Sequence, residues 1–477
     1  MKSTTLLLAL SAVLSSPAVA SPPRKRDNDS SPRVLKAHVQ RQAIADPIAA
    51  DAKRLRRRDG TVNATMDNSE ILYFVNGTLG TPPQPVRMHL DTGSSDLWVN
   101  TGVSELCQSR GSPCAESGTY NANSSSSYQY VGSYFNISYV DGSGASGDYV
   151  TDTMSLFGQQ VKTVQFGVGY QSTSPQAVLG IGYMANEASV ARLQMSQYQN
   201  LPARMVSEGI ISSKAYSLWL NDIDAQDGTI LFGGIDKGRF QEPLVSVPIQ
   251  KVGKQFAEFY ITMTGLSIGN TATADKIALA VLLDSGSSFT YLPSDITNSI
   301  YKTLNAKFEQ RSGVAYVPCS LRNQDATFKF RFSDPAEVDV PLRELVIDPA
   351  QLPQGRAVNF GDGVPACYLG ILPSDNSISV LGDTFLRSAY VVYDLDNNKI
   401  SLAKTRFNAT TSDIQAIGKG NDAVPKAIVA KNPVAATSGL PSRSDGSGTS
   451  DGNGGALVAP SMTLSVLALA LSVLVGF

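Results

Sequence analysis

The feature that most constrains this chain is an internal duplication. The segment HLDTGSSDLWV at 89–99 has a counterpart, LLDSGSSFTYL, at 282–292. The aspartates of the two segments, Asp91 and Asp284, are 193 residues apart. Self-similarity on this scale indicates a structural unit that occurs twice.

A second pair of similar segments follows the first in the same order. AVLGIGY at 177–183 places Gly180 89 residues after the first aspartate, and SVLGDTF at 379–385 places Gly382 98 residues after the second. The same order at nearly the same spacing predicts two similar lobes, each of which carries one aspartate.

The body of the chain, from about 69 to 407, has the pattern of a mostly β protein. Alternating apolar segments are broken by Gly, Asn, Asp and Pro, and helical periodicity is confined to stretches near 201–208 and 294–308. Each aspartate stands where an apolar strand, Val86–Leu90 or Ile277–Leu283, meets a Thr/Ser-Gly-Ser turn. Glycine permits a tight turn there, and the hydroxyl groups can donate to a carboxylate or brace a facing loop.

Composition excludes several reaction classes. The 477 residues include only two histidines, His38 and His89, and four cysteines. A His-rich metal site is therefore impossible, and the ligand set for catalytic zinc is missing. Thiol or Ser-His catalysis would have to use His89, which lies on the strand that leads into Asp91.

Charge is divided unevenly along the chain. Residues 1–58 carry a net charge of +8 and residues 59–477 carry −10, which gives −2 overall. A basic leader thus precedes an acidic body. No stretch of the body is basic enough to predict nucleic-acid binding by phosphate neutralisation.

The N-terminal segment has the pattern of a secretory signal peptide. Lys2 precedes an apolar run from Leu6 to Leu14, and small residues then fit cleavage after Ala20, which makes 1–20 the signal peptide. An N-terminal membrane anchor is the alternative, and the short apolar run disfavours it.

Residues 21–58 have the pattern of a propeptide. They contain Lys25-Arg26 and end in a basic cluster at 54–58, which in a secreted protein indicates a processing site and a mature start near Asp59. A basic pro-segment around Val34-Leu35-Lys36 lying across an acidic body would make the protein a zymogen. The alternative is that this charge is merely solvated.

The C-terminal end predicts a lipid anchor. Residues 464–477 are apolar or small with no basic flank, and 14 residues are fewer than the roughly 20 that a spanning helix needs. Small residues upstream give the arrangement of a glycosylphosphatidylinositol (GPI) signal, with attachment at Asn453, or next at Gly452, and removal of 454–477. The alternative, a single tilted span from near Ala456, conflicts with Pro460 and with the missing basic flank.

Residues 408–453 are rich in Ser, Thr, Gly, Ala, Pro and Lys, with almost no large apolar side chains, and this composition predicts a solvated stalk. Secretion would also make the Asn-X-Ser/Thr sequons eligible for N-glycosylation. They lie at Asn63, Asn76, Asn123, Asn136 and Asn408.

The motifs together resemble the pepsin family of aspartic proteases (family A1). The resemblance covers Ile71 to Phe407 and rests on YFVNGTLGTPPQPVRMHLDTGSSDLWV, ISYVDGSGASGDYVTDTM, VLLDSGSSFTYLP and ISVLGDTFLRSAYVVYDLDNNKISLA. With the anchor signal and the stalk, it is most similar to the GPI-anchored fungal yapsins. The resemblance implies a bilobal, mostly β fold, with two similar β-barrel-like lobes at 59–245 and 246–407 and the active-site cleft between them.

The resemblance also implies roles for the residues of the two loops. Asp91 and Asp284 would be the catalytic pair. The hydroxyls of Thr92 and Ser285 would brace the loops across the lobe interface. The hydroxyls of Ser94 and Ser287 would bond the outer carboxylate oxygens, and Gly93 and Gly286 would be the turn glycines.

A flap over the cleft is implied by Tyr139, followed by the turn that contains Gly142; the alternative for this tyrosine is an ordinary half-buried strand aromatic. Trp98 would pack behind the flap. Asp141 departs from the uncharged residue of digestive relatives, and a carboxylate there would favour Lys or Arg before the scissile bond. Its alternative is a solvent-facing turn aspartate.

The four cysteines match family disulfides, Cys107 with Cys114 and Cys319 with Cys367. The function expected overall is a glycosylated aspartic endopeptidase, made as a zymogen, active in acid and anchored outside the cell at the plasma membrane or wall. Peptides and proteins with basic sites would be its substrates, and no cofactor, metal, nucleic acid or second subunit is expected. The alternatives are a broad-specificity acid protease retained at the surface, or an inactive homologue with a binding or wall-structural role.

Overall fold

The computed structural model describes residues 34–43, 71–139, 143–352, 356–374 and 378–441. These residues fall within one compact unit that ends at Pro441. No helix in these ranges is both long and apolar enough to cross a membrane. The predicted signal peptide, the processing site at 54–58, Asn63, Asp141, Gly142 and the anchor site Asn453 lie outside the described residues.

The largest sheet within the described ranges has fourteen strands in the order β28-β12-β26-β25-β9-β10-β1-β2-β3-β8-β4-β7-β6-β5. Its strands are β1 Leu35–Ala43, β2 Ile71–Leu79, β3 Gln84–Asp91, β4 Leu97–Asn100, β5 Gln129–Ser138, β6 Gly144–Leu156, β7 Gln159–Ser172, β8 Ala177–Gly180, β9 Ala215–Trp219, β10 Asp227–Phe232, β12 Phe240–Pro248, β25 Ala389–Asp394, β26 Lys399–Thr405 and β28 Ile428–Val429.

Three further sheets contain the remaining strands. The first comprises β13 Tyr260–Ile268, β14 Thr271–Leu283, β15 Thr290–Leu292, β18 Thr327–Arg331, β19 Glu337–Pro341, β23 Ile371–Pro373 and β24 Ser379–Leu381. The second comprises β16 Lys307–Glu309, β17 Val314–Pro318, β20 Val346–Ile347, β21 Val358–Asn359 and β22 Pro365–Leu369, and the third pairs β11 Gly234–Asp236 with β27 Ile414–Ala416.

The helices are short. They are α2 Glu105–Gln108, α3 Ala188–Leu193, α4 Leu201–Ser207, α5 Ser294–Leu304, α6 Leu342–Leu345 and α7 Asp383–Leu386, with 3₁₀ turns η1 Ala122–Ser124, η2 Met184–Asn186, η3 Lys237–Arg239, η4 Cys319–Asn323 and η5 Pro349–Gln351. Helices α4 and α5 confirm the two predicted helical stretches. Helix α5 forms because Ile296 and Ile300, four residues apart, are buried on one face.

The duplicated motifs occupy equivalent places in the fold. β3 pairs in parallel with β8, which also pairs antiparallel with β4. In the second half, β14 pairs in parallel with β24, which pairs antiparallel with β15. In each half, the apolar strand of the second motif therefore lies between the two arms of the aspartate loop.

Glycine is required where each inserted strand meets its loop. A side chain at Gly180 would come within 2.6 Å of the backbone nitrogen of Asp96, and one at Gly382 within 2.3 Å of the carbonyl oxygen of Ser287. No Cβ atom fits at these distances, which explains the glycine in both VLG segments. The mostly β, bilobal fold predicted from the duplication is confirmed.

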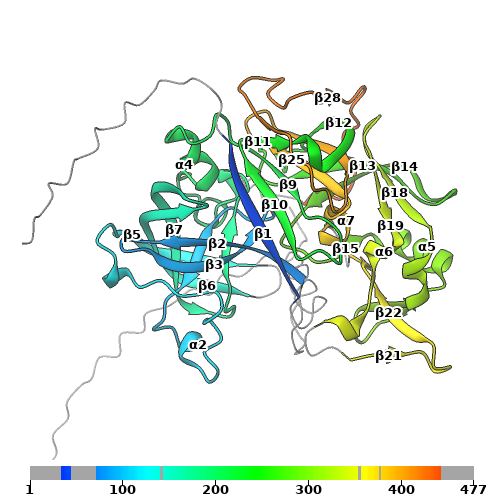
Figure 1. Ribbon diagram of the computed structural model, residues 1–477, viewed down its shortest axis with the longest axis horizontal. Coiled ribbons are helices and arrows are strands. Elements are labelled where there is room, and N and C mark those ends of the chain that lie inside the picture. Colours follow the sequence, from blue (N-terminus) through cyan, green and yellow to red (C-terminus); the bar gives the residue numbers. More distant parts are fainter. Residues whose placement is uncertain (1–33, 44–70, 140–142, 353–355, 375–377, 442–477) are drawn as a thin grey trace, which may run out of the picture. The chain divides into compact units, whose positions relative to one another are not determined.

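Strands from both halves share the large sheet. β25 and β26 lie far along the chain but pair with β9 and β12 respectively, and Figure 1 shows β25, in orange, among these green strands. The lobe boundary predicted between 245 and 246 falls inside β12. This strand belongs to the part of the sheet that both halves of the chain share.

The predicted propeptide contributes a strand to this sheet. β1 pairs antiparallel with β10 on one side and with β2 on the other (Figure 1, dark blue). The side chains of Ala37 and Val39 are fully buried in the main core. Part of the 21–58 segment is therefore integral to the folded chain.

The start of the predicted stalk needs correction. Residues 408–441 lie against the body, with β27 paired to β11 and β28 paired to β12. Ile417 is fully buried. Backbone hydrogen bonds from Thr437 N to the carbonyl of Ala278, and from Ala280 N to the carbonyl of Ser438, join the end of this segment to β14. Small residues such as Ala423 fill this interface, so a composition low in large apolar side chains was compatible with packing.

Candidate active site

The first aspartate is held rigidly at the end of β3. Asp91 Oδ1 accepts a hydrogen bond from the backbone N–H of Gly93 at 2.8 Å, and its Oδ2 accepts one from the hydroxyl of Ser94 at 2.6 Å. Its side chain is 1 % exposed. The backbone carbonyl of Asp91 accepts from Ile181 N, which fixes the loop to the strand inserted beside it.

The second aspartate repeats this arrangement atom for atom. Asp284 Oδ1 accepts from Gly286 N at 2.8 Å, and Oδ2 accepts from the hydroxyl of Ser287 at 2.8 Å. Both carboxylates are thus oriented by one turn N–H and one serine hydroxyl. A methyl group on Gly93 would come within 2.6 Å of Asp284 Oδ1, which shows how closely the second carboxylate approaches the first loop.

Hydroxyl groups cross-link the two loops. Thr92 Oγ1 accepts from Ser285 N at 2.9 Å and donates to the carbonyl of Leu283 at 3.0 Å. Reciprocally, Ser285 Oγ accepts from Thr92 N at 3.2 Å and donates to the carbonyl of Leu90 at 2.9 Å. These four buried bonds fix the two loops against each other, as the resemblance implied.

Both carboxylates line one cavity of about 370 Å³. Residues from both halves of the chain form its wall: Asp91, Gly93, Ser94, Asp96, Ile137, Ser138, Tyr139, Asn186, Ala188, Ala191, Arg192, Glu258, Leu282, Asp284, Ser287 and Val380. A cavity of this size is within the ordinary range for ligand-binding pockets.

Tyr139 lies in the wall of this cavity, at the end of strand β5. Its hydroxyl accepts a hydrogen bond of 2.6 Å from Trp98 Nε1. Burial, reinforced by the charge of Asp91, raises the pKa of Tyr139 well above its ordinary value, so the phenol remains neutral. Trp98 is fully buried and packs behind it, as predicted.

Besides Glu258, which lines the cavity, three ionisable residues near it were missed by sequence reasoning. Asp96 is 1 % exposed and accepts from the Tyr149 and Tyr198 hydroxyls, at 2.7 and 2.9 Å, and from Ala188 N at 2.8 Å. Burial raises the pKa of Asp96, although these hydrogen bonds oppose the shift. Glu187 is fully buried beside it, and burial raises the pKa of Glu187 to about 9.

The third missed residue is Arg192, which donates to the carbonyl of Ser138 beside Tyr139. Only the DTGSSD run, which places an acid five residues after the first aspartate, carried any local signal for these three residues. Their proximity to one another arises from tertiary packing, which the sequence pattern does not reveal.

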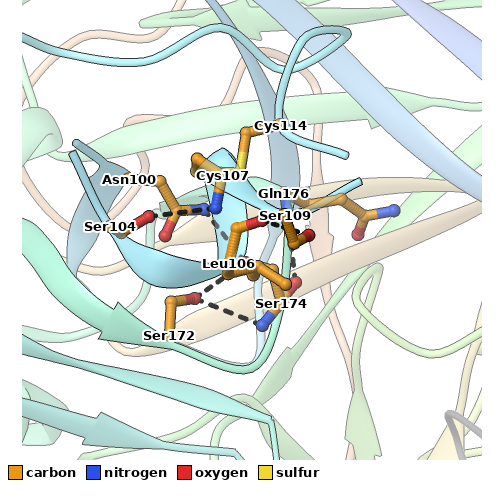
Figure 2. Close-up of a disulfide and its surroundings, with 9 residues drawn as sticks. All are labelled: Asn100, Ser104, Leu106, Cys107, Ser109, Cys114, Ser172, Ser174 and Gln176. Atoms are coloured by element: carbon orange, nitrogen blue, oxygen red, sulfur yellow. Dashed lines mark hydrogen bonds between the residues drawn. A yellow bond between two sulfur atoms is a disulfide. The ribbon is translucent and has the colours of Figure 1, made fainter. Parts of the chain in front are cut away.

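Both predicted disulfides are confirmed, Cys107–Cys114 and Cys319–Cys367. Figure 2 shows the first of them at the short helix α2, whose N-terminus is capped by the hydroxyl of Ser104 acting on Cys107 N. Nearby, the side-chain amide of Asn100, the last residue of β4, donates to the carbonyl of Ser174. This bond ties the end of β4 to the segment that follows β7.

The sequons within the described ranges differ in their surroundings. Asn123 and Asn136 are exposed, the second on the outer side of β5. The side-chain amide of Asn76 donates to Gln40 in β1, and that of Asn408 donates to Asp222 at 2.5 Å. Asn76 and Asn408 are exposed as well, but their side-chain amides are already hydrogen-bonded.

Comparisons with known proteins agree with this geometry. Residues 72–405 match the model of the family described as eukaryotic aspartyl protease. The chain is 52 % identical over 409 residues to a "Probable aspartic-type endopeptidase opsB" of Aspergillus oryzae, with 84 % of this chain and 82 % of that one covered. It is 32 % identical to an "Acid protease" of Saccharomycopsis fibuligera, over 83 % of this chain and 98 % of that protein. It is also 32 % identical to "Secreted aspartic protease 1" of Candida albicans, over 77 % of this chain and 90 % of that protein.

The family match spans both aspartate loops, the cavity between them and the strands that hold them. Two carboxylates in matched frames, braced against each other at one cavity, fit the same assignment. The chain therefore belongs to the eukaryotic aspartyl protease family and is an aspartic-type endopeptidase.

Proposed function

We propose that the chain is a secreted, surface-anchored endopeptidase that works in acid, uses Asp91 and Asp284 as its catalytic pair and prefers Lys or Arg before the scissile bond. The observation that carries the proposal is the equivalence of the two loops. Each carboxylate receives the same two hydrogen bonds, from a turn N–H and a serine hydroxyl, and both face one cavity.

The proposed reaction follows from this symmetry. Two carboxylates at one site cannot both ionise readily, so the pair holds one proton between them; the pepsin pair is the standard illustration of this behaviour. The ionised partner takes a proton from a water molecule as that water attacks the peptide carbonyl, while the protonated partner donates to the carbonyl oxygen. As the C–N bond then breaks, the proton taken from water passes to the leaving amine, and the hydroxyl formed on the carbonyl oxygen returns its proton to the other aspartate. Because the reaction uses one protonated and one ionised carboxyl, we expect activity in acid.

Tyr139 has a separate role in the proposal. It lies in the cavity wall and is held by Trp98, and β5, which ends just before it, pairs antiparallel with β6 to form a hairpin. Such a hairpin closes over a bound peptide, excludes bulk water and orients the scissile bond. Ile137 and Ser138 of the same strand also line the cavity and would contact the bound peptide.

The preference for basic residues rests on Asp141 and is tested by replacing it. Asp141→Asn is expected to lower the ratio of kcat/KM for Lys or Arg over Leu before the scissile bond by about tenfold, since one ion pair with the substrate is lost. The matched control is Asp362→Asn, at an exposed loop carboxylate. An unchanged ratio would instead support the broad-specificity alternative.

Secretion, maturation and anchoring are proposed from the sequence. The signal at 1–20, the basic cluster at 54–58 and the tail after Asn453 supply the three processing sites. The burial of β1 in the main core supports a zymogen whose pro-segment folds with the enzyme. Among the sequons, Asn123 and Asn136 are the ones we propose to carry glycans, because the equally exposed Asn76 and Asn408 have side-chain amides that are already hydrogen-bonded.

One experiment tests these processing steps together. Protein purified from the surface of intact cells is deglycosylated and mapped by mass spectrometry. The proposal expects a mature N-terminus at or near Asp59, deamidated Asn123 and Asn136 after enzymatic glycan removal, and a C-terminal peptide that ends at Asn453 and carries the anchor remnant. A C-terminal peptide that extends to Phe477 would contradict the lipid anchor.

A further inference from the structure

The β5–β6 hairpin next to Tyr139, which we call the flap, is held at its outer edge by a side chain from elsewhere in the chain. β5 is the last strand in the order of the large sheet, so its outer edge has no strand partner in the described part of the chain. Residues two apart on a strand present their carbonyl groups to the same edge. The carbonyls of Asn136 and Ser138 both accept hydrogen bonds from the guanidinium of Arg192, at 3.4 and 2.9 Å.

The same guanidinium also donates to the hydroxyl of Ser138 at 3.1 Å. Ser138 directly precedes Tyr139, and Ser138, Tyr139 and Arg192 all line the cavity. Hydrogen bonds donated by a charged group are stronger than neutral ones, and the planar fork of arginine suits two acceptors at once. Arg192 therefore acts where the chain enters the flap.

Arg192 acts from a helix that is itself fixed to the first aspartate loop. Helix α3 has only six residues, too few to be stable alone. Its first N–H, that of Ala188, donates to Asp96 Oδ2 at 2.8 Å. The preceding residue, Glu187, is fully buried and accepts from Tyr198 N at 2.9 Å.

Asp96 in turn belongs to the loop that begins at Asp91. Its backbone carbonyl accepts from Gly180 N at 3.1 Å, and its side chain accepts from the hydroxyl of Tyr149 on the flap strand β6. Trp98, two residues further on, donates to the Tyr139 hydroxyl. The segment that carries the first aspartate thus reaches the flap by two routes, directly through Trp98 and indirectly through Asp96, α3 and the guanidinium.

We propose that Arg192 is a positioning residue that holds the base of the flap and thereby places Tyr139 over the two aspartates. Without this side chain, the carbonyls of β5 lose their partner and the flap samples open positions more often. Substrate binding then includes the cost of ordering the flap, so KM rises more than kcat falls.

The test compares Arg192→Leu with Arg204→Leu in the mature enzyme. Arg204 is a matched control, since it also donates from a short helix to a backbone carbonyl, that of Lys162 at 3.0 Å, but lies outside the cavity wall. For Arg192→Leu, we expect KM for a peptide that the parent enzyme cleaves efficiently to rise about tenfold. The kcat should stay within about threefold of the parent's kcat. Arg204→Leu should leave both constants within about twofold, and Arg192→Lys should recover part of the loss because its ammonium can still donate to Ser138.

A fluorescence measurement separates positioning from direct substrate contact. The chain has two tryptophans, so Trp219→Phe leaves Trp98 as the only indole, hydrogen-bonded to the flap tyrosine. In this background, Arg192→Leu should make Trp98 more accessible to acrylamide, and pepstatin in the cleft should reverse the change. Unchanged quenching and an unchanged KM would overturn the proposal. So would a KM change confined to peptides with Asp or Glu near the scissile bond, because Arg192 would then act on the substrate itself.

Discussion

Asp91→Asn and Asp284→Asn are each expected to lower kcat/KM for peptide cleavage by about 10³-fold or more, since each removes one of the two groups that exchange protons with water and substrate. The amide of asparagine cannot take up a proton from water at acid pH, and it cannot share a proton with the remaining aspartate. The measurement is steady-state kinetics at acid pH. The mature form of each variant must be prepared in a way that does not require the variant to process itself.

The same variants are expected to fold. The side-chain oxygen of asparagine still accepts from Gly93 N or Gly286 N, and the neighbouring serine hydroxyl can rotate to meet an amide. Thermal unfolding of both should therefore stay close to that of the parent protein. The double variant should be no less active than either single one, because the pair acts as a unit. Cleavage retained by either single variant would contradict the proposed chemistry.

Glu187→Gln is expected to change how stability depends on pH. Burial raises the pKa of Glu187 from its ordinary 4.5 to about 9, an effect that nearby Asp96 reinforces and the hydrogen bond from Tyr198 N opposes. The folded protein therefore keeps this carboxyl protonated, while the unfolded chain releases the proton above pH 4.5. Stability is unaffected below that pH and falls as pH rises towards 9.

The size of the effect follows from the pKa difference. Between pH 4.5 and 7, the single group lowers the free energy of unfolding by about 3 kcal/mol. Glutamine has no proton to release, so between pH 4.5 and 7 the unfolding free energy of Glu187→Gln should fall by about 3 kcal/mol less than that of the parent protein. Urea unfolding of both proteins at several pH values between 4 and 8 provides the comparison.

Glu105→Gln is the control for this prediction, because Glu105 is exposed on α2 and its replacement should leave the pH dependence unchanged. Parallel stability curves for the parent and Glu187→Gln proteins would show that Glu187 does not carry the shift. The expected result would link the buried carboxyls behind the flap to a preference of the fold for acid.

The sequence was sufficient for the two aspartate loops because their determinants are local. A strand, an aspartate and a Thr/Ser-Gly-Ser turn fix the carboxylate, its N–H donor and its hydroxyl donor within four residues. The family resemblance then implied that the loops face each other, and the bonds between Thr92 and Ser285 show that they do.

Other features depend on segments that are distant in sequence. Arg192 meets Ser138 across 54 residues and Asp96 meets Ala188 across 92, so no short pattern signals either contact. The segment 408–441 resembled a stalk because its buried residues are mainly small, and alanine does not distinguish a solvated tail from a closely packed one.

The measurement that tests the central claim most directly is cleavage of a mixed peptide library at pH 4 by the mature enzyme, with and without pepstatin, beside Asp91→Asn. The account predicts internal cleavage that pepstatin abolishes and that the variant lacks, with cuts gathered after Lys and Arg. Pepstatin-resistant cleavage, or equal cleavage by the variant, would contradict a mechanism in which the two aspartates activate water.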